Sequence, residues 1–253
     1  MSEPQIEEEN NSNNSRFLSQ NMLNSVDIVV SYINSDLLPL LINEDDELVL
    51  ECIAKRDDLD ENLKYVLAES VYDSVRAQLA LNQTCNSELL NKLYNENQKT
   101  YKVRKNISMN INVTTELLEK LGRDKNQKVC AAVAENIHTP SHIIDELILH
   151  PRKSVRESVL RNEELLNEKL HKFVNDKSDD IRYALASDES GRVEVSTLEI
   201  LSKDSESVIR AAVAKNKQTP IDIVKEMKND ESEMVIDTVN ERLVGLSNPV
   251  RPF

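Results

Sequence analysis

Five arginines occupy one recurring position in this sequence, and their guanidinium groups are the side chains best suited to binding chemistry. They are Arg76, Arg104, Arg156, Arg182 and Arg210. A guanidinium group binds a carboxylate or a phosphate through two parallel hydrogen bonds, so this arginine row could bind an acidic partner or phosphates. The alternative, which we favour, is structural: each arginine pairs with an aspartate that recurs in the loops and so bridges successive repeats. The recurring aspartates are Asp124, Asp176, Asp204 and Asp230.

No other combination of side chains predicts catalysis or metal binding. His138 and His142 have the spacing of a metal-binding pair on a helix, but Pro140 lies between them and no third ligand is evident. Adjacent carboxylates fall in expected loops or helix starts, where negative charge complements the helix dipole. The motifs of phosphate loops, serine nucleophiles and zinc proteases are missing. The sequence therefore predicts a protein that is not an enzyme and has no catalytic residue, cofactor or metal.

The cysteines and the N-terminal residues predict where the protein works. Cys52, Cys85 and Cys130 are odd in number and far apart, which favours reduced, buried thiols over disulfides. The N-terminal stretch MSEPQIEEENNSNNS has neither the basic nor the apolar region of a secretory signal. No run approaches the roughly 20 apolar residues that a membrane helix needs. We expect a cytoplasmic protein.

Composition narrows both the fold class and the partners. The chain of 253 residues has 31 Lys and Arg against 45 Asp and Glu, a net charge of −14. Such a charge repels nucleic-acid backbones and anionic membranes, so both are disfavoured as partners. There are only 3 glycines and no tryptophan. Scarce glycine disfavours glycine-rich phosphate loops and tight hairpins, and favours helices.

The elements that position the arginine row follow from an internal repeat. Residues 129–136 and 209–216 share the pattern apolar-x-Ala-Ala-Val-Ala-x-Asn, and each is followed by x-x-Thr-Pro. The residue after the first apolar position defines an anchor, which recurs every 26 or 28 residues. The eight anchors are Leu50, Arg76, Arg104, Cys130, Arg156, Arg182, Arg210 and Ile236. A fixed period of this kind is typical of stacked repeats.

Each repeat predicts two helices separated by a turn. Apolar residues just before the anchor and three after it, such as Val129 and Val133, share one helical face. A second apolar cluster, such as Ile143, Ile144 and Leu147, has helical spacing too. An asparagine ends the first helix, where we expect the left-handed conformation. Thr-Pro should then supply an N-cap and a first-turn proline. The asparagines are Asn82, Asn110, Asn136, Asn162 and Asn216, with Asp188 at the same position in a sixth repeat.

The full repeat pattern resembles one known family. Val-Arg-x-Ala-Val-Ala-x-Asn-x-x-Thr-Pro-x-x-Ile-Val-x-x-Met-x-x-Asp is similar to the leucine-rich repeat variant, and it also resembles a shortened HEAT repeat. The resemblance implies an all-α, right-handed superhelical solenoid of about eight helix pairs. It covers about residues 45–242. The family prototype has an N-terminal iron–sulfur cysteine cluster; this chain lacks those cysteines, so the resemblance implies no such cofactor here.

The extent of the repeat pattern divides the chain into four segments. Residues 1–20 are expected to be a disordered acidic, Asn-rich tail. Residues 21–44 should form degenerate helices that cap the first repeat. Residues 45–243 form the solenoid, and residues 244–253 are expected to be a C-terminal tail.

The sequence predicts a non-catalytic scaffold or adaptor that binds a protein or peptide on its solenoid surface. An acidic DNA mimic that inhibits a nucleic-acid-binding protein is the alternative, and a HEAT-like DNA glycosylase is a weaker one. Mixed charge with exposed apolar residues would favour the scaffold, a continuous acidic face the mimic, and a basic groove the glycosylase. The sequence specifies neither the oligomeric state nor the concave helix layer. Exposed candidates for binding are Glu116, Lys120, Asp145, Lys225 and Lys228 in second helices, and Lys105, Glu157 and Tyr183 in first helices.

Overall fold

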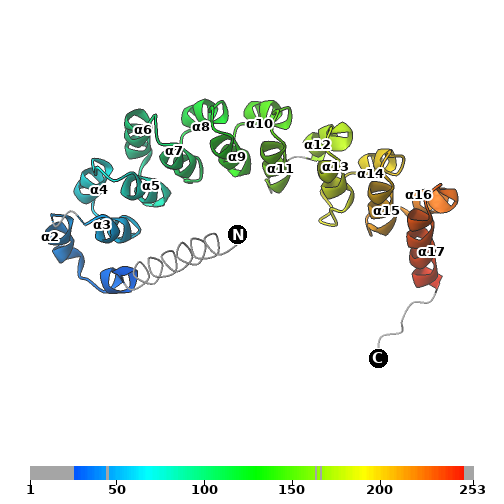
Figure 1. Cartoon of the computed structure of the whole chain (residues 1–253), viewed down its shortest axis with the longest axis horizontal. Helices are drawn as coiled ribbons and strands as arrows, with labels where there is room; N and C mark the ends of the chain where they lie inside the picture. The colour runs from blue at the N-terminus through cyan, green and yellow to red at the C-terminus, as the bar shows by residue number, and fades with distance from the viewer. Residues whose placement is uncertain (1–25, 44–45, 163, 166, 248–253) are drawn as a thin grey trace, which may run out of the picture. The chain divides into compact units, whose positions relative to one another are not determined.

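The structure is a computed structural model that describes residues 26–43, 46–162, 164–165 and 167–247 (Figure 1). Across these residues all regular secondary structure is helical, with no strand, which confirms the predicted all-α repeat fold. By its internal contacts the chain divides into two compact units, Met1–His138 and Thr139–Phe253. Each unit is described by itself.

The first unit begins with a helical segment over residues 26–31 and a short 3₁₀ turn, η1 (Ser35–Leu37). The helices that follow are α2 (Leu38–Ile42), α3 (Glu47–Ala54), α4 (Glu61–Ala68), α5 (Asp73–Leu81), α6 (Ser87–Glu96), α7 (Tyr101–Ser108), α8 (Thr115–Gly122) and α9 (Gln127–Glu135).

The second unit continues the alternation of two helices per repeat. Its elements are α10 (Ser141–Ile148), α11 (Lys153–Arg161), α12 (Asn167–Leu170), η2 (His171–Asn175), α13 (Asp179–Ala186), α14 (Val195–Leu201), α15 (Ser207–Lys215), α16 (Ile221–Glu226), η3 (Met227–Asn229) and α17 (Glu233–Ser247).

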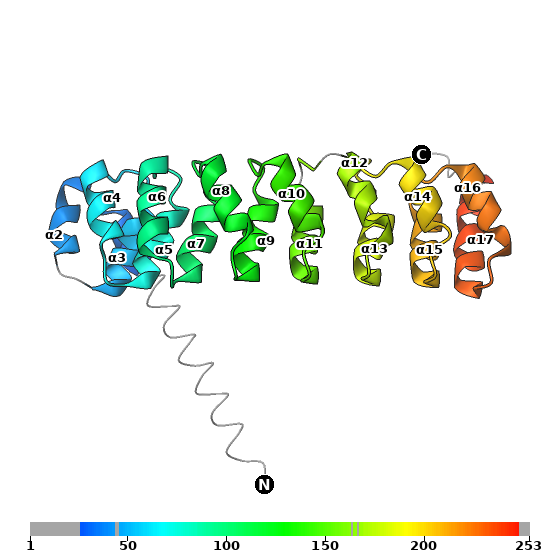
Figure 2. The ribbon, with the colours of Figure 1, turned by 90° about the horizontal axis from the view of Figure 1, so that it is seen from above.

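Two layers form each unit, because each repeat contributes one helix to each layer. The eight anchors lie in the odd-numbered helices from α3 to α17, so these are the first helices of the repeats. In the first unit, α3, α5, α7 and α9 line the inner side of a curve, and α4, α6 and α8 stack outside them (Figures 1 and 2). The first-helix layer is therefore the concave one in this unit.

The core lies between the layers and matches the predicted register. Val129 and Val133 of α9 are fully buried, as are Val103 and Ile107 of α7. Ala134, directly after Val133, is also fully buried. A small side chain at this position lets neighbouring first helices approach closely, and α7 packs against α9.

The turns between the two helices differ from the prediction. Asn136 and Asn216 have φ of −73° and −63°, so they are extended rather than left-handed. Pro140 and Pro220, not the threonines before them, are the N-caps, so each second helix begins one residue later than predicted. The Thr219 hydroxyl donates to the Val213 carbonyl at 2.7 Å, at the end of the preceding helix. These expectations were wrong because the turn is shaped by contacts made within the turn and to neighbouring repeats, not by the capping of one helix.

The two ends of the chain lie partly outside the described residues. The predicted disordered tail over residues 1–20 falls wholly outside them, as do residues 248–253 of the predicted C-terminal tail. α17 continues to Ser247, so residues 244–247 of that expected tail are helical. Among the described residues, no helix has both the length and the apolarity needed to cross a bilayer.

Candidate functional site

Arg104 of α7 shows how a member of the arginine row is used. Its Nε and Nη2 donate to the two carboxylate oxygens of Asp124, at 2.6 and 3.1 Å. Its Nη1 donates to the backbone carbonyl of Gln98 at 2.6 Å. Gln98 precedes α7, and Asp124 follows α8. One guanidinium group therefore joins the loop before its repeat to the loop after it.

The second unit repeats this arrangement three times in succession. Arg156 pairs with Asp176 at 2.7 and 2.8 Å, Arg182 with Asp204 at 2.7 and 3.1 Å, and Arg210 with Asp230 at 2.7 and 2.8 Å.

These three pairs also contact one another through the backbone. Arg182 donates to the carbonyl of Asp176 at 2.7 Å, and Arg210 donates to that of Asp204 at 2.8 Å. Each of these aspartates thus accepts from one arginine with its side chain and from the next with its backbone. We call this connected set, from Arg156 to Asp230, the arginine–aspartate row of the second unit.

Among the repeats from Arg76 to Arg210, two depart from the arginine–aspartate pair. Arg76 donates its Nε to the amide oxygen of Asn97 at 2.6 Å, and pairs with Asp73 on its own helix. Cys130 stands where the repeats on either side have Arg104 and Arg156, and its thiol donates to the backbone carbonyl of Asp124 at 3.1 Å. His150 stands at the aspartate position, and its Nδ1 accepts from the N–H of Arg152 at 3.1 Å. Cys130 therefore still donates to the carbonyl of the preceding loop, and His150 still accepts a backbone N–H, although neither side chain is that of the other repeats.

Most of these pairs are shielded from water. Arg104 is 2% exposed, and Arg156 and Arg210 are buried as well. The hydrogen bond from Arg210 holds the pKa of Asp230 below its usual value, and burial opposes this shift. Because the fork of each guanidinium group already binds a carboxylate, its geometry leaves little donor capacity for a ligand. This arrangement favours the structural reading of the arginine row.

Asparagines form a second set of contacts between repeats, which the sequence located but did not explain. Asn110 is fully buried, and its Nδ2 donates to the carbonyls of Ala80 and Asn82 at 3.0 and 2.9 Å. Its Oδ1 accepts from the N–H of Asn112 at 2.9 Å. The same donation to two carbonyls of the preceding repeat is made by Asn82, Asn136 and Asn216. We call this set the asparagine row.

Asparagine suits this position because its short side chain has both a donor and an acceptor. The amide oxygen closes the turn, and the amide nitrogen satisfies carbonyls at the end of the preceding repeat's first helix. The recurrence of asparagine, with no glycine at this position in any repeat, is a signal that could have indicated a side-chain role, whereas the prediction was a left-handed backbone.

Arginines replace asparagine at the outermost repeats. Arg242 of α17 donates to the carbonyls of Ala214 and Asn216 at 2.7 and 2.5 Å. Arg56, after α3, donates to the carbonyl of Val30 at 2.5 Å. At both ends a longer side chain therefore makes the contact to the neighbouring helical segment.

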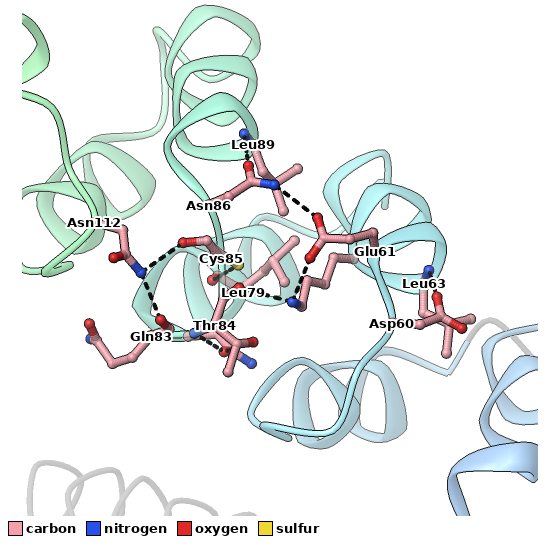
Figure 3. Close-up of polar contacts among 12 residues, drawn as sticks. Asp60, Glu61, Leu63, Leu79, Gln83, Thr84, Cys85, Asn86, Leu89 and Asn112 are labelled. Atoms are coloured by element: carbon pink, nitrogen blue, oxygen red, sulfur yellow. Dashed lines mark hydrogen bonds and ion pairs between the residues drawn. The ribbon is translucent and has the colours of Figure 1, made fainter.

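Contacts among α4, α5 and α6 hold the second-helix layer in the first unit (Figure 3). Asn86 caps α6 by accepting from the N–H of Leu89 at 2.9 Å, and its Nδ2 donates to Glu61 of α4 at 2.9 Å. The Cys85 thiol donates to the Leu79 carbonyl at 3.3 Å. Polar side chains in this region therefore connect repeats to one another.

The cysteines and histidines do not assemble into a reactive site. Cys52, Cys85 and Cys130 are buried free thiols, and burial raises the pKa of each to about 11. His138 and His142 are exposed. Within the described part of the chain, no three His, Cys, Asp or Glu side chains come together as a metal site.

Several predicted binding residues are engaged in ion pairs. Glu116 pairs with Lys120 along α8 at 2.7 Å, and Asp145 of α10 binds Lys169 and Lys172 at 2.6 and 2.8 Å. In the same way Lys225 pairs with Asp222, and Glu157 with Lys153. Lys105 is half-buried, and Lys228 and Tyr183 are exposed.

Exposed apolar residues on the first helices of the second unit were missed from the sequence. Val208 of α15 and Met234 of α17 stand at the same repeat position, two residues before the anchor, and are exposed. Together with Tyr183 of α13 they place an exposed apolar side chain on each of three successive first helices. Asp180 and Asp237, also exposed, add charge to the same helices. We call Tyr183, Val208 and Met234 the apolar strip.

The fold and the two rows define a helical repeat solenoid. A solved structure described as a leucine-rich repeat variant with a novel repetitive structural motif is similar to this chain, with a TM-score of 0.64 and 18% identity over 83% of this chain and 82% of that one. The likeness shows that the two share a fold, as the sequence resemblance predicted.

Two designed armadillo repeat proteins also match. One, in complex with the peptide (KR)4, has 15% identity over 89% of this chain and 91% of that one, with a TM-score of 0.26. The other has 16% identity over 90% and 92%, with a TM-score of 0.25. No protein-family model and no curated protein matches the chain.

Proposed function

We propose that the protein is a non-catalytic scaffold that binds a protein or peptide partner across its first-helix layer. The apolar strip is the observation that carries this proposal. Tyr183 and Val208 are 44% and 45% exposed although both lie on helices whose other large apolar residues are buried. Exposed apolar side chains on successive first helices favour contact with another molecule.

The strip suits a partner in extended conformation. Neighbouring helix axes lie about 8–10 Å apart, and an extended chain advances about 3.3 Å per residue. A peptide that crosses α13, α15 and α17 would therefore place about every third residue over a new helix. The exposed carboxylate of Asp237, on the same helix as Met234, adds a hydrogen-bond acceptor for such a peptide, whereas Asp180 is paired with Lys153 at 2.5 Å.

The surface charge supports this proposal over the acidic mimic of DNA. A mimic requires one continuous acidic face. The first helices of the second unit instead combine exposed apolar residues with both signs of charge, for example Lys153 on α11 and Asp180 on α13.

A peptide-display selection on the full chain would test the proposal. We expect enriched peptides, and we expect the Tyr183→Ala/Val208→Ala variant to bind them about tenfold or more weakly, since central aromatic and apolar contacts dominate such interfaces. Ile200→Ala/Val195→Ala is the matched control, because Ile200 and Val195 are 44% and 47% exposed on α14 in the other layer. Circular dichroism melts would verify that both variants fold.

The selection has clear contrary outcomes. Failure to enrich any peptide on the full chain would contradict peptide binding. Equal weakening by the α14 variant would move the binding surface away from the first-helix layer.

A further inference from the structure

Five lysines gather on α7, α9 and the loops that precede them in the first unit. We call them the lysine cluster. They are Lys99, Lys102, Lys105, Lys125 and Lys128. Lys99 and Lys125 share one repeat position, just before α7 and α9, and Lys102 and Lys128 share another, within the first turn of these two helices, which pack together. Four of the five are exposed, and Lys105 is half-buried.

No member of the lysine cluster forms an ion pair with a described residue, whereas many lysines elsewhere do. Lys64, Lys92 and Lys169, for example, each bind a carboxylate within 3.4 Å. In the cluster, the ammonium of Lys128 lies 5.5 Å from the ring centre of Tyr101 on α7. This cation–π contact leaves the positive charge in place and orients it across the two helices.

Folding does not account for this concentration of charge. Like charges on neighbouring helices repel one another, and the chain as a whole has a net charge of −14. The nearest members of the arginine row do not add to the cluster, because Arg104 is buried against Asp124. An unpaired positive cluster on an acidic protein therefore indicates an acidic ligand.

Acidic residues limit the extent of the cluster. Asp73 begins α5, the first helix of the preceding repeat, and it accepts a hydrogen bond from Thr100 at 3.0 Å. Glu135 ends α9. A long polyanion that continued from the cluster toward α5 would meet the carboxylate of Asp73, whereas a short acidic segment would end before it. This boundary favours a peptide over a nucleic acid.

We propose that the lysine cluster binds a short acidic segment of a partner protein, with carboxylates about three residues apart over α7 and α9. The spacing follows from the distance of about 8–10 Å between helix axes and about 3.3 Å per residue of extended chain. The inference rests on the proposed peptide-binding function for its kind of partner, but it uses other residues than the apolar strip and a different unit.

Fluorescence anisotropy with the full chain would test this proposal. The probe is a labelled peptide with Glu at every third position, and a peptide with Gln in place of Glu is its neutral control. We expect the Glu peptide to bind, and its affinity to fall steeply between about 50 mM and about 500 mM NaCl, because salt screens exposed charges. The neutral peptide should not bind.

Charge reversal would locate the site. Lys102→Glu/Lys128→Glu should weaken binding of the Glu peptide by about tenfold or more, since it turns two attractions into repulsions. Lys203→Glu/Lys217→Glu is the matched control, because Lys203 and Lys217 are exposed lysines of the second unit. We expect it to change the affinity by less than about twofold. All variants replace surface residues, and circular dichroism would verify that they fold.

Three outcomes would overturn the proposal. Equal weakening by the control variant would show that only net charge matters. Tighter binding of a single-stranded oligonucleotide of equal charge would assign the cluster to nucleic acid. Binding that appears only after Glu7, Glu8 and Glu9 are changed to Gln would assign the cluster to the chain's own acidic segment. Tyr183→Ala/Val208→Ala should leave binding of the Glu peptide unchanged. Failure of the proposal for the lysine cluster can therefore be distinguished from failure of the proposal for the apolar strip.

Discussion

Asp188 and Arg192 together make the hydrogen bonds that a single asparagine makes in other repeats. Asp188 Oδ1 accepts from the N–H of Ser190 at 2.7 Å, as the amide oxygens of the asparagine row do. A carboxylate has no N–H to donate, and Arg192 supplies it. Its Nη2 binds Asp188 at 3.0 Å, and its Nη1 donates to the carbonyl of Asn162 at 3.1 Å. Gly191, with φ of +86°, lets the inserted loop place Arg192 there.

This pairing predicts a rescue experiment. Arg192→Ala removes the donor and leaves the carboxylate of Asp188 facing carbonyl oxygens, so we expect a loss of about 1–3 kcal/mol in the free energy of unfolding. Adding Asp188→Asn should restore much of that loss, because an asparagine amide then replaces the guanidinium group. Urea denaturation measures both. A double variant no more stable than Arg192→Ala would show that the two residues are not coupled.

The arginine–aspartate row predicts a large effect on stability and a small one on binding. Arg182→Gln leaves the buried carboxylate of Asp204 without its partner, which costs about 3–5 kcal/mol. Arg182→Gln/Asp204→Asn should cost less, since no unpaired charge remains. Arg156→Gln/Arg182→Gln should lower the melting temperature yet leave peptide affinity nearly intact. Unchanged melting with lost binding would instead place the partner on the arginine row.

The sequence predicts a contact between side chains when both partners recur with the repeat and have complementary charge. Arg104 and Asp124 could be matched because both recur with the repeat and their charges are opposite. The role of Asn110 could not be predicted, because its amide donates to backbone carbonyls of the preceding repeat. The sequence does not show how close the side chain of one repeat lies to the backbone of the next. Arg192 lies in a two-residue insertion that has no counterpart in other repeats, so periodicity could not assign it.

The binding surfaces were harder to predict for a related reason. The period gives the buried positions, because apolar residues must recur there, but exposed positions are free to vary. Tyr183 was named as exposed, whereas Val208 and Met234 resemble core residues until their exposure is known. Of the lysine cluster, only Lys105 was among the residues predicted to bind a partner. Its neighbours Lys102 and Lys128 form a cluster only because α7 and α9 pack together.

The asparagine row predicts that burial sets the cost of losing an amide. Asn110 is fully buried and Asn112 is exposed, yet each donates to two carbonyls of the preceding repeat. Asn110→Ala should cost about 1–3 kcal/mol, and Asn112→Ala clearly less, because water can satisfy exposed carbonyls. Asn110→Asp should be worse than Asn110→Ala, since no arginine is placed to compensate as Arg192 does for Asp188. Equal costs at both positions would contradict this explanation.

The buried thiols predict slow chemical modification. With pKa values raised to about 11 by burial, Cys85 and Cys130 are almost wholly protonated at neutral pH, and a protonated thiol is a poor nucleophile. We expect iodoacetamide to label none of the three cysteines at pH 8 in the folded protein and all three after denaturation in guanidinium. Mass spectrometry of digested protein identifies each site. Rapid labelling of folded protein at Cys130 would show that its repeat opens.

The pair of Arg210 and Asp230 predicts how stability depends on pH. The hydrogen bond from Arg210 lowers the pKa of Asp230 in the folded protein, so the folded state binds this proton less readily than the unfolded state. The stabilisation is therefore complete above the usual aspartate pKa of about 4, and it is lost as the pH falls through the lower, folded-state value. Other carboxylates also contribute to the pH dependence of stability. A comparison with a variant isolates the contribution of Asp230.

Arg210→Met/Asp230→Asn removes the titrating group together with its partner and leaves no buried charge behind. Between about pH 6 and pH 2.5, we expect the free energy of unfolding of this variant to fall less than that of the unaltered protein. Urea denaturation at each pH, followed by circular dichroism, measures both curves. Asp222→Asn is the control, because Asp222 forms an exposed pair with Lys225 and exposed ion pairs contribute little to stability. Parallel curves for Arg210→Met/Asp230→Asn and the unaltered protein would mean that Asp230 does not couple protonation to folding.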